Sequence, residues 1–320
     1  MRAVVVGAGI AGLLAGHTLR DAGISVLLFE AGPVPGGRLA TRQTAAGAAD
    51  IGAQFFTVRD QRFQQLVEAW ERAGLVRQWS SGFSDGARPP EDGFPRYVVR
   101  GGMRALAAYL AQSLEVRLGQ RVRAIAAEGG RWRVQSDSGE TVVTDGVVLT
   151  PPLPAALPLV AGALPAGTYR QLAAVRYRRT LSAVVTVEES VLPPPGAVQR
   201  PNDRLAFVAD NQRKGLASAP VLTIHASPEW SDALWPLDDE AVLARLIAAA
   251  QPYFRGTPRD AILDRWPFAL PEPVLPERAV AVGTLLFAGD AFAGPRVEGA
   301  ALSGLAAGDH LSALLAASGA

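Results

Sequence analysis

The stretch AVVVGAGIAG, residues 3–12, decides the fold of this chain. Its apolar, β-branched first half predicts a strand that is buried on both faces of a parallel sheet. The strand leads directly into a GxGxxG spacing, and a helical pattern of leucines follows at 13–19. A strand, a glycine turn and a helix in this order are typical of a dinucleotide-binding unit.

Each glycine of the turn has a physical reason. Gly7 allows the tight turn from strand to helix, Gly9 lets the backbone approach a pyrophosphate, and Gly12 lets the helix pack closely on the strand. A pyrophosphate then lies on backbone N–H groups at a helix N-terminus, where the partial charge is roughly +0.5.

A second apolar strand at 25–29 ends in Glu30, where an acid meets the ribose hydroxyls of a dinucleotide. A carboxylate at this place repels a 2′-phosphate, so NADP is disfavoured in this first site. A structural turn without a nucleotide is the alternative, because a lone GxGxxG is weak evidence in a chain with 33 glycines. The order of strand, turn, helix, strand and acid favours the nucleotide.

The composition bounds the class of protein. The 320 residues suggest roughly two domains, and with 49% hydrophobic residues the chain can bury a large core. A net charge of +1 gives no electrostatic reason to expect a nucleic-acid partner. The absence of cysteine excludes disulfides, thiolate metal sites and dithiol redox chemistry. The sequence has no apolar run of about 18 residues, the length that a membrane span needs, so we expect a cytoplasmic protein with no membrane partner. We also expect no metal.

The loop after Glu30 departs from a simple NAD domain. Where such a domain continues with a helix and a strand, this chain has Gly36-Gly37 for close backbone approach. Arg38 and Arg42 follow as cations that suit anionic oxygens. The segment DIGAQFF comes next, at 50–56.

The run from Glu30 through GGR to DxGxxxF resembles the FAD-binding signature of the flavin amine oxidase superfamily. The segment GRLATR followed by GAQFFTVRD is similar to sequences of the renalase-like branch of this superfamily. The resemblance implies FAD as the cofactor, and the absence of cysteine forbids a flavin tethered through that residue.

A second signal lies near the end of the chain, where Gly289-Asp290 before a helix resembles the closing motif of FAD folds. The resemblance implies that Asp290 accepts hydrogen bonds from the ribitol hydroxyls. It also implies that the helix N-terminus at 297–300 points its dipole at flavin N1 and O2, where a positive field stabilises the anionic reduced flavin.

The expected cofactor-binding residues come from these motifs, from the strand end at Thr150, and from Val122, which the resemblance places at the adenine side. They are Gly7, Gly9, Ile10, Ala11, Gly12, Glu30, Ala31, Gly37, Arg38, Gln54, Phe55, Val122, Thr150, Gly289, Asp290, Val297, Gly299 and Ala300.

Substrate-lining positions are implied by the resemblance alone. The FTxRD-like segment at 56–60 and the RYV tract at 96–98 match segments of renalase-like proteins that lie near the substrate. Thr180 matches another such position, and Arg265-Trp266 resembles the tryptophan-bearing strand ahead of the closing motif. The candidates are Phe56, Thr57, Val58, Arg59, Asp60, Arg96, Tyr97, Val98, Thr180, Arg265, Trp266 and Arg296, and no catalytic residue is assigned.

Each of these positions has a structural alternative. Asp60 is most simply a helix N-cap, and Tyr97 can be a partly buried tyrosine that is satisfied by backbone. Arg265 and Trp266 can be a packing pair held by a cation–π contact. Arg296 either adds to the positive field, holds an anionic substrate, or is a surface arginine. Thr180 suits the solvent face of a sheet equally well.

The second half of the chain changes to short alternating runs. Runs at 122–126, 131–135 and 141–144 with turn residues between them predict a β-meander, and 146–150 predicts another buried strand. Strands at 177–187, 221–226 and 262–266 and an amphipathic helix at 239–250 predict a second domain, while 78–95 predicts a surface loop.

The expected fold class is therefore α/β, with two domains. The first is a discontinuous Rossmann-type FAD-binding domain of the glutathione-reductase kind, at 1–55, 96–150 and 272–320. The second is a substrate domain with a mixed or antiparallel sheet, at 56–95 and 151–271.

The function that the resemblance favours is an FAD-dependent oxidase. Such an enzyme takes a hydride from 2- or 6-dihydro-NAD(P) and is reoxidised by O2, giving NAD(P)+ and hydrogen peroxide. Hydride transfer needs alignment more than an acid or base. The sequence has only one GxGxxG, so a nicotinamide substrate has no separate Rossmann domain and must meet the flavin directly. The expected partners are therefore a small dinucleotide substrate and O2. The oligomeric state is not assigned.

Two alternatives differ in class. Amine oxidases of this fold place a lysine, through water, at flavin N5. The one lysine here, Lys214, lies in a loop that resembles the renalase-like branch instead. A flavin-binding protein without turnover is the third possibility, since few titratable candidates are evident among three histidines and this lysine.

Overall fold

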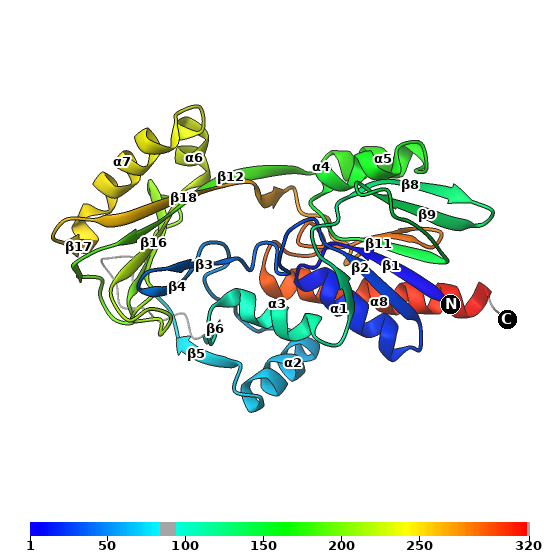
Figure 1. Ribbon diagram of the computed structural model, residues 1–320, viewed down its shortest axis with the longest axis horizontal. Helices are drawn as coiled ribbons and strands as arrows, with labels where there is room; N and C mark the ends of the chain where they lie inside the picture. Colours follow the sequence, from blue (N-terminus) through cyan, green and yellow to red (C-terminus); the bar gives the residue numbers. More distant parts are fainter. Residues whose placement is uncertain (84–93, 319–320) are drawn as a thin grey trace. The chain divides into compact units, whose positions relative to one another are not determined.

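The computed structural model describes residues 1–83 and 94–318. The chain forms two compact units, each assembled from segments far apart in the sequence (Figure 1). Unit 1 comprises Met1–Gly37, Ala107–Arg176 and Leu270–Ala320, and unit 2 comprises Arg38–Leu106 and Tyr177–Ala269. The predicted α/β class is confirmed.

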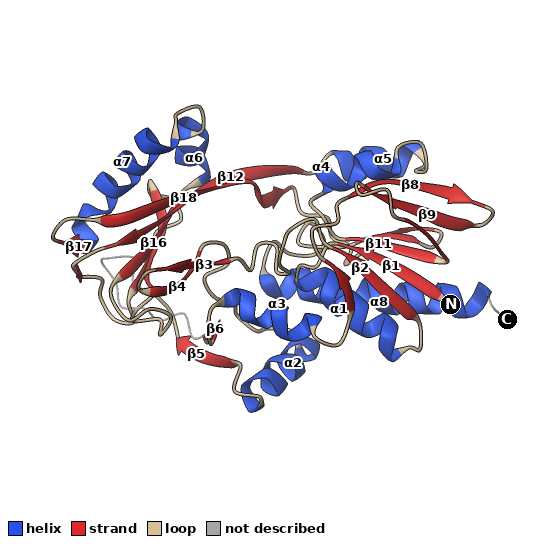
Figure 2. Ribbon diagram, viewed as in Figure 1, coloured by secondary structure: helices blue, strands red, loops and turns tan. Residues whose placement is uncertain are grey.

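Unit 1 is built on a six-stranded sheet with the order β19-β20-β11-β1-β2-β7 (Figure 2). The pairs from β20 to β7 are parallel, and β19 joins β20 antiparallel. Residues 3–6 of the central strand are at most 5% exposed, as a strand covered on both faces must be. The strands are β1 (Arg2–Val6), β2 (Ser25–Phe29), β7 (Glu115–Arg117), β11 (Gly146–Leu149), β19 (Val280–Val282) and β20 (Leu285–Phe287).

One face of this sheet is covered by α1 (Ile10–Asp21) and α8 (Val297–Ser318), which lie side by side. A Cβ at Gly304 would lie 2.1 Å from the carbonyl oxygen of Ala11, so glycine alone permits this close crossing. By length and composition α8 is apolar enough to cross a membrane, but its packing on α1 and its 56% burial are those of a core helix. A third helix, α3 (Met103–Ala111), precedes β7.

The other face carries the predicted β-meander. It consists of β8 (Val122–Glu128), β9 (Arg131–Ser136) and β10 (Thr141–Thr144), paired antiparallel. Gly129 and Gly130 turn the first hairpin with positive φ, at 57° and 78°. The 3₁₀ turn η1 (Leu157–Val160) lies beside β8, and it is contacted by α4 (Leu153–Ala156) and α5 (Ala166–Ala173).

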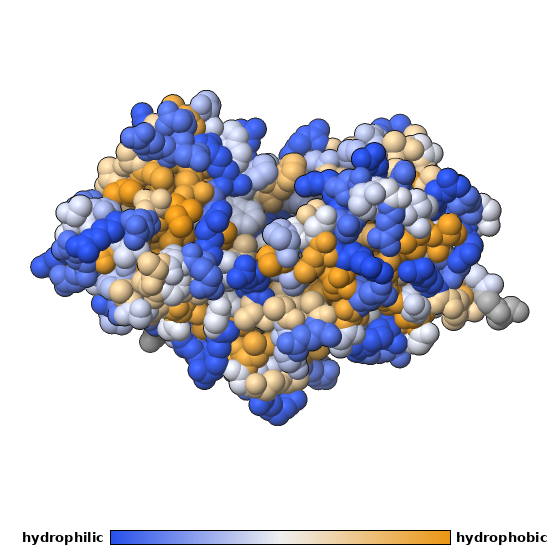
Figure 3. Space-filling view, in the orientation of Figure 1, coloured by the Kyte–Doolittle hydropathy of each residue, from blue (hydrophilic) through white to orange (hydrophobic). Residues whose placement is uncertain are grey.

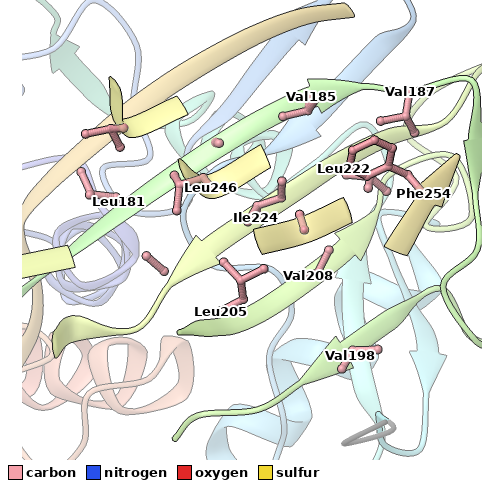
Figure 4. Close-up of a cluster of buried hydrophobic side chains, with 14 of the residues drawn as sticks. Leu181, Val185, Val187, Val198, Leu205, Val208, Leu222, Ile224, Leu246 and Phe254 are labelled. Carbon is pink, nitrogen blue, oxygen red and sulfur yellow. The ribbon is translucent and has the colours of Figure 1, made fainter. Parts of the chain in front are cut away.

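Unit 2 is built on a five-stranded sheet with the order β14-β15-β16-β12-β18. One face packs under α6 (Pro228–Leu234) and α7 (Asp239–Ala250), and Figure 4 shows Leu181, Leu222, Ile224 and Leu246 meeting there. In Figure 3 apolar side chains are visible where α7 lies along this sheet. The strands are β12 (Arg176–Thr186), β14 (Ala197–Gln199), β15 (Leu205–Asp210), β16 (Val221–Ala226) and β18 (Arg259–Glu272).

The opposite face of the unit 2 sheet receives the hairpin of β3 (Thr41–Thr44) and β4 (Gly47–Asp50). Ala49 and Ile51 pack there on Val184 and Val221. The remaining elements of the unit are α2 (Gln61–Arg72), β5 (Val76–Ser80), β6 (Arg96–Val99), β13 (Glu189–Ser190), the 3₁₀ turn η2 (Gln251–Tyr253) and β17 (Phe254–Arg255).

The division between the units differs from the predicted boundaries in three main segments. Residues 38–55 and 96–106 fall in unit 2, because the β3–β4 hairpin buries its apolar side on the unit 2 sheet. Residues 151–176 fall in unit 1, because the turns after β11 lie against β8. The predicted loop at 78–95 begins within β5, and its residues 84–93 lie outside the described residues.

We predict that Gly304→Ala lowers the melting temperature of the protein, with a cost of about 1–3 kcal/mol for overpacking the α1–α8 crossing. The control is Gly167→Ala on α5, where a Cβ meets nothing within 4 Å. That change should stabilise the helix by roughly 0.5–1 kcal/mol. Calorimetry checks both variants, and equal melting temperatures would contradict the assigned helix contact.

Candidate active site

Four strand ends meet at one edge of the unit 1 sheet. Gly7 follows β1, Glu30 follows β2, Thr150 follows β11 and Gly289 follows β20. Backbone hydrogen bonds continue the ladder past the strands, with Gly7 N–H donating to the Phe29 carbonyl at 2.7 Å and Thr150 N–H to the Val6 carbonyl at 3.0 Å. In parallel α/β sheets, ligands bind at this carboxyl edge, next to the point where strand order reverses.

The glycine turn has one open position and two filled ones. A Cβ at Gly12 would lie 1.9 Å from the Gly7 carbonyl oxygen, and Gly7 itself has φ of +99°. A Cβ at Gly9 would meet only the Gly36 carbonyl oxygen, at 3.9 Å. Gly7 and Gly12 are therefore required by the protein's own backbone, whereas the space at Gly9 is left for a ligand.

The N-terminus of α1 is suited to an anion. Gly9 is its N-cap, and among the described residues no side chain caps the helix and no acid lies in its first turn. The backbone N–H groups at Ile10 and Ala11 therefore present the positive end of the helix dipole at the open position beside Gly9. A pyrophosphate has the charge that suits this place.

Glu30 is held in place by the neighbouring backbone. Its Oε2 accepts from Ala8 N–H at 2.7 Å and its Oε1 accepts from Gly32 N–H at 2.7 Å. Each carboxylate oxygen has a second lone pair, so both can still accept a ribose hydroxyl. The loop after Glu30 returns along the glycine turn, since Gly36 N–H donates to the Ala8 carbonyl at 2.9 Å.

The closing motif lies in the same unit. Gly289 has φ of +135° and its N–H donates to Ser303 Oγ at 2.8 Å, which ties the turn after β20 to α8. Asp290 is buried. Gly299 lies so close to the Gly294 carbonyl oxygen that a Cβ would come within 2.3 Å of it. This contact between Gly299 and Gly294 fixes the position of the first turn of α8, which includes Val297 and Ala300. The backbone N–H groups at the start of the helix lie in this turn.

The unit 1 residues fit FAD. They provide an open glycine turn, a helix N-terminus free of acids in its first turn, a fixed carboxylate and a second helix N-terminus behind an aspartate. Val122 is buried in β8 of the same unit, while Ala31 and Gly37 are exposed in the loop after Glu30.

The arginines of the GGR loop have partners inside unit 2. Arg42 forms a two-pronged ion pair with Asp264 on β18, which raises the pKa of Arg42, so the expectation that it faces a ligand's anionic oxygens is wrong. Arg38 Nη1 donates to the carbonyl oxygens of Phe268 and Ala269, both at 3.3 Å. Its guanidinium also lies 5.9 Å from the Tyr177 ring centroid.

A buried ion pair lies at the end of the β3–β4 hairpin. Lys214 Nζ donates to Asp50 Oδ2 at 2.6 Å, and both side chains are 0% exposed. Gln54 Oε1 lies 3.5 Å from the same ammonium, and the Trp79 ring centroid lies 5.4 Å from it. Burial lowers the pKa of Lys214, and the Asp50 carboxylate opposes that shift.

His225 on β16 is a satisfied strand histidine. Its Nε2 lies 3.1 Å from the Ile51 carbonyl oxygen and 3.5 Å from Gln54 Nε2. Burial lowers the pKa of His225 from 6.5 to about 4. The imidazole is therefore neutral at pH 7 and donates its Nε2–H to Ile51.

Several of the predicted substrate-lining residues come together in unit 2. Phe56 and Tyr97 stack with ring centroids 5.7 Å apart and exchange two backbone hydrogen bonds. Phe56 is also buried against Phe63 of α2, so it belongs to a core. Arg96 is buried, with its guanidinium 5.6 Å from the Phe55 ring centroid.

Other candidates have structural partners. Asp60 is the N-cap of α2, accepting from Arg62 N–H at 2.8 Å, which confirms the alternative interpretation of that residue. Arg265 donates to the carbonyls of Trp235 and Leu237, and its guanidinium lies 5.5 Å from the Trp235 ring, so its cation–π partner is Trp235 and not Trp266.

The remaining candidates are distributed over both units. Trp266 Nε1 donates to the Ile51 carbonyl at 3.1 Å. Arg59 is exposed, and its guanidinium lies 4.7 Å from the Phe94 ring centroid. Thr180 is partly exposed on β12, and Arg296 is exposed before α8. Thr57 and Val58 are partly exposed, and Val98 is buried in β6.

Sequence reasoning missed the role of Asp50. We quoted it only as the first letter of DIGAQFF, although it binds Lys214, Thr41 and the start of α3. The signal available was a single lysine in a chain otherwise rich in arginine.

Comparison with known proteins agrees with this geometry. The model of the flavin containing amine oxidoreductase family matches residues 77–311, and that of an NAD(P)-binding Rossmann-like domain matches residues 5–70. The protein belongs to the flavin containing amine oxidoreductase family. The family and the Rossmann-like match indicate FAD as the cofactor.

One curated relative shows which branch of the family this chain resembles. The chain is 30% identical to mouse (Mus musculus) renalase over 168 residues, which are 49% of this chain and 49% of that protein. The match therefore spans about half the length of this relative. The predicted similarity to the renalase-like branch is confirmed.

The fold is that of solved amine oxidases. Cyclohexylamine oxidase from Brevibacterium oxydans superposes with a TM-score of 0.78 at 15% identity, covering 98% of this chain and 99% of that one. Wild-type putrescine oxidase bound to putrescine superposes with a TM-score of 0.74 at 16% identity, with coverage of 98% and 99%.

We predict that Gly9→Val leaves the melting temperature of the FAD-free protein close to wild type and abolishes FAD retention on purification. The added side chain fills the open position, where the protein itself makes no close contact. Gly12→Val, by contrast, should unfold unit 1, because its Cβ meets the Gly7 carbonyl. A Gly9→Val protein with stoichiometric flavin would contradict the pyrophosphate position.

We also predict that stability falls as the pH drops below about 6.5, since the unfolded chain then takes up a proton that folded His225 refuses until about pH 4. His17 acts in the same direction, because burial lowers its pKa as well. Thermal melts between pH 4 and 8 check this, and His225→Gln should flatten the curve. An equally steep curve in that variant would contradict the assignment to His225.

Proposed function

We propose that the protein oxidises isomeric dihydro-NAD(P), with the hydride leaving the 2- or 6-position of the dihydropyridine. In the overall reaction, dihydro-NAD(P), O2 and one proton give NAD(P)+ and hydrogen peroxide. The support is the GAQFFTVRD segment and the 30% identity to mouse renalase over half of the chain. We further propose a cytoplasmic location.

The observation that carries this proposal is the position of Lys214. Many amine oxidases of this fold place a lysine that reaches flavin N5 through water. The one lysine of this chain is instead 1% exposed and donates to Asp50 at 2.6 Å. A dihydropyridine needs no such group, because it becomes aromatic on losing the hydride and no proton has to be removed from it first.

The residues of unit 1 bind and orient the cofactor in this proposal. The α1 N-terminus holds the pyrophosphate, Glu30 accepts from the adenosine ribose, and Asp290 accepts from the ribitol. Bound FAD supplies hydride acceptance at N5 and later transfer of two electrons to O2. In this proposal the N-terminus of α8 contributes positive potential where negative charge develops, and the buried Glu298 in its first turn opposes part of that potential.

Arg296 has the position and charge for the anionic part of the substrate. It is exposed directly before the first turn of α8. A guanidinium is always charged at neutral pH and binds phosphate oxygens through two parallel N–H groups. A dinucleotide substrate carries such oxygens, whereas a small amine carries none.

The experiment that tests the proposed function is anaerobic mixing of the yellow protein with a panel of reductants. The panel contains 2-dihydro-NAD, 6-dihydro-NAD, ordinary 4-dihydro-NAD, putrescine and cyclohexylamine. We expect the two uncommon isomers to bleach the flavin band fastest. Bleaching by an amine alone would favour an amine oxidase, and no bleaching by any member would favour a flavin-binding protein without turnover.

We predict that Arg296→Ala slows flavin reduction by about tenfold, the factor for one lost charged contact of roughly 1.4 kcal/mol, and changes FAD affinity less than that. Arg245→Ala on α7 is the matched control, since that arginine is exposed on the outer helix of unit 2. Stopped-flow absorbance measures both rates. Identical rates in the two variants would remove Arg296 from the site.

A further inference from the structure

Lys214 is the one lysine among 31 lysine and arginine residues, and it is fully buried. An ammonium is a compact charge, while a guanidinium is larger and planar. The site of the Lys214 ammonium, between Asp50, Gln54 and the Trp79 ring, therefore suits lysine and not arginine.

Asp50 is the centre of the surrounding network. Its Oδ1 accepts from Thr41 Oγ1 at 2.6 Å and from Met103 N–H, the first residue of α3, at 2.7 Å. Its Oδ2 takes the ammonium of Lys214. The carboxylate thus ties β3, the start of α3 and the 211–217 loop to one point.

The backbone that follows Asp50 is fixed by side chains of the unit 2 sheet. The Asp50 carbonyl accepts from Thr223 Oγ1 at 2.8 Å and from Gln54 Nε2 at 2.7 Å. The Ile51 carbonyl accepts from Trp266 Nε1 and lies 3.1 Å from His225 Nε2.

The other side of this segment touches the GGR loop. Ala53 N–H donates to the Arg38 carbonyl at 2.9 Å, and a Cβ at Gly52 would lie 2.1 Å from the same oxygen. The segment 50–55 therefore has little room to adopt a second conformation. It carries Gln54 and Phe55, two of the residues that the sequence predicts to contact FAD.

We propose that Lys214 is a positioning residue, whose ion pair with Asp50 fixes segment 50–55 in the single conformation that receives FAD. The ammonium acts on the cofactor through Asp50 and Gln54 and takes no part in proton or hydride transfer. This role rests on FAD binding and does not depend on which substrate is oxidised.

The energetics give the pair a recognisable signature. Removing one partner of a buried ion pair leaves a charge unpaired and is strongly destabilising, while replacing both partners by neutral groups is often close to neutral. In Lys214→Met the Asp50 carboxylate is unpaired. In the double variant Asp50→Asn/Lys214→Met the buried charge is gone, and Thr41, Thr223 and Trp266 still hold the segment.

The first test measures FAD binding to FAD-free protein by fluorescence, together with the visible circular dichroism of the bound flavin. For Lys214→Met we expect a Kd for FAD raised by about tenfold or more and an altered flavin dichroism. The double variant should bind FAD more tightly than Lys214→Met. Binding of Lys214→Met within twofold of wild type would overturn the proposal.

A destabilised control separates positioning from stability. Leu246→Ala removes a buried side chain of α7 from the core on the opposite face of the sheet, and should lower the melting temperature. It should leave the Kd and the flavin dichroism unchanged. If Leu246→Ala weakens FAD as much as Lys214→Met does, Lys214 has only a structural role.

The second test uses the single lysine as a probe of wild-type protein. Lysine labelled at 13Cε and 15Nζ gives one side-chain resonance, which reports the charge of Lys214 directly. We expect the resonance of a charged ammonium at pH 7, with and without FAD. The resonance of a neutral amine would overturn the ion pair, whatever substrate the enzyme oxidises.

Discussion

The close approach of two backbone segments at the glycine turn is the constraint on which unit 1 depends. Gly12 lies against the Gly7 carbonyl, and Thr150 Oγ1 donates to the Val6 carbonyl at 2.8 Å beside it. These contacts bring the start of α1 to the carboxyl edge of the sheet and leave the space at Gly9 open. Glu30 and the closing turn at Gly289 follow two other strands of the same sheet, so one sheet edge collects the groups that suit an ADP-bearing cofactor.

Unit 2 depends on a different kind of interaction. Its sheet has one apolar face, covered by α6 and α7, and one face that binds the polar backbone of segment 50–55. Backbone carbonyls away from water need partners, and Thr223 and Trp266 provide them. The Asp50–Lys214 pair completes this polar layer. Segment 50–55 is thereby fixed by hydrogen bonds as well as by packing.

The sequence predicted unit 1 well because its signals are local. The glycine spacing, the buried strands and the acid after β2 each follow from a few consecutive residues, and the strand at 25–29 has the predicted bounds. In unit 2 the strand at 221–226 and the helix at 239–250, which also follow from local patterns, have the predicted bounds as well. Unit 2 was harder, since Arg42 and Asp264 lie 222 residues apart and Asp50 and Lys214 lie 164 apart. No local pattern reports such a pair, so Arg42 was assigned to a ligand and Asp50 was overlooked.

The central claim is that the cofactor is held by its ADP part at the carboxyl edge of the unit 1 sheet. The most direct measurement is calorimetric titration of FAD-free protein with FAD and with FMN, which has the same flavin ring but lacks that part. The account predicts one FAD bound per chain and an FMN affinity lower by about a hundredfold or more. FMN binding as tightly as FAD would contradict it.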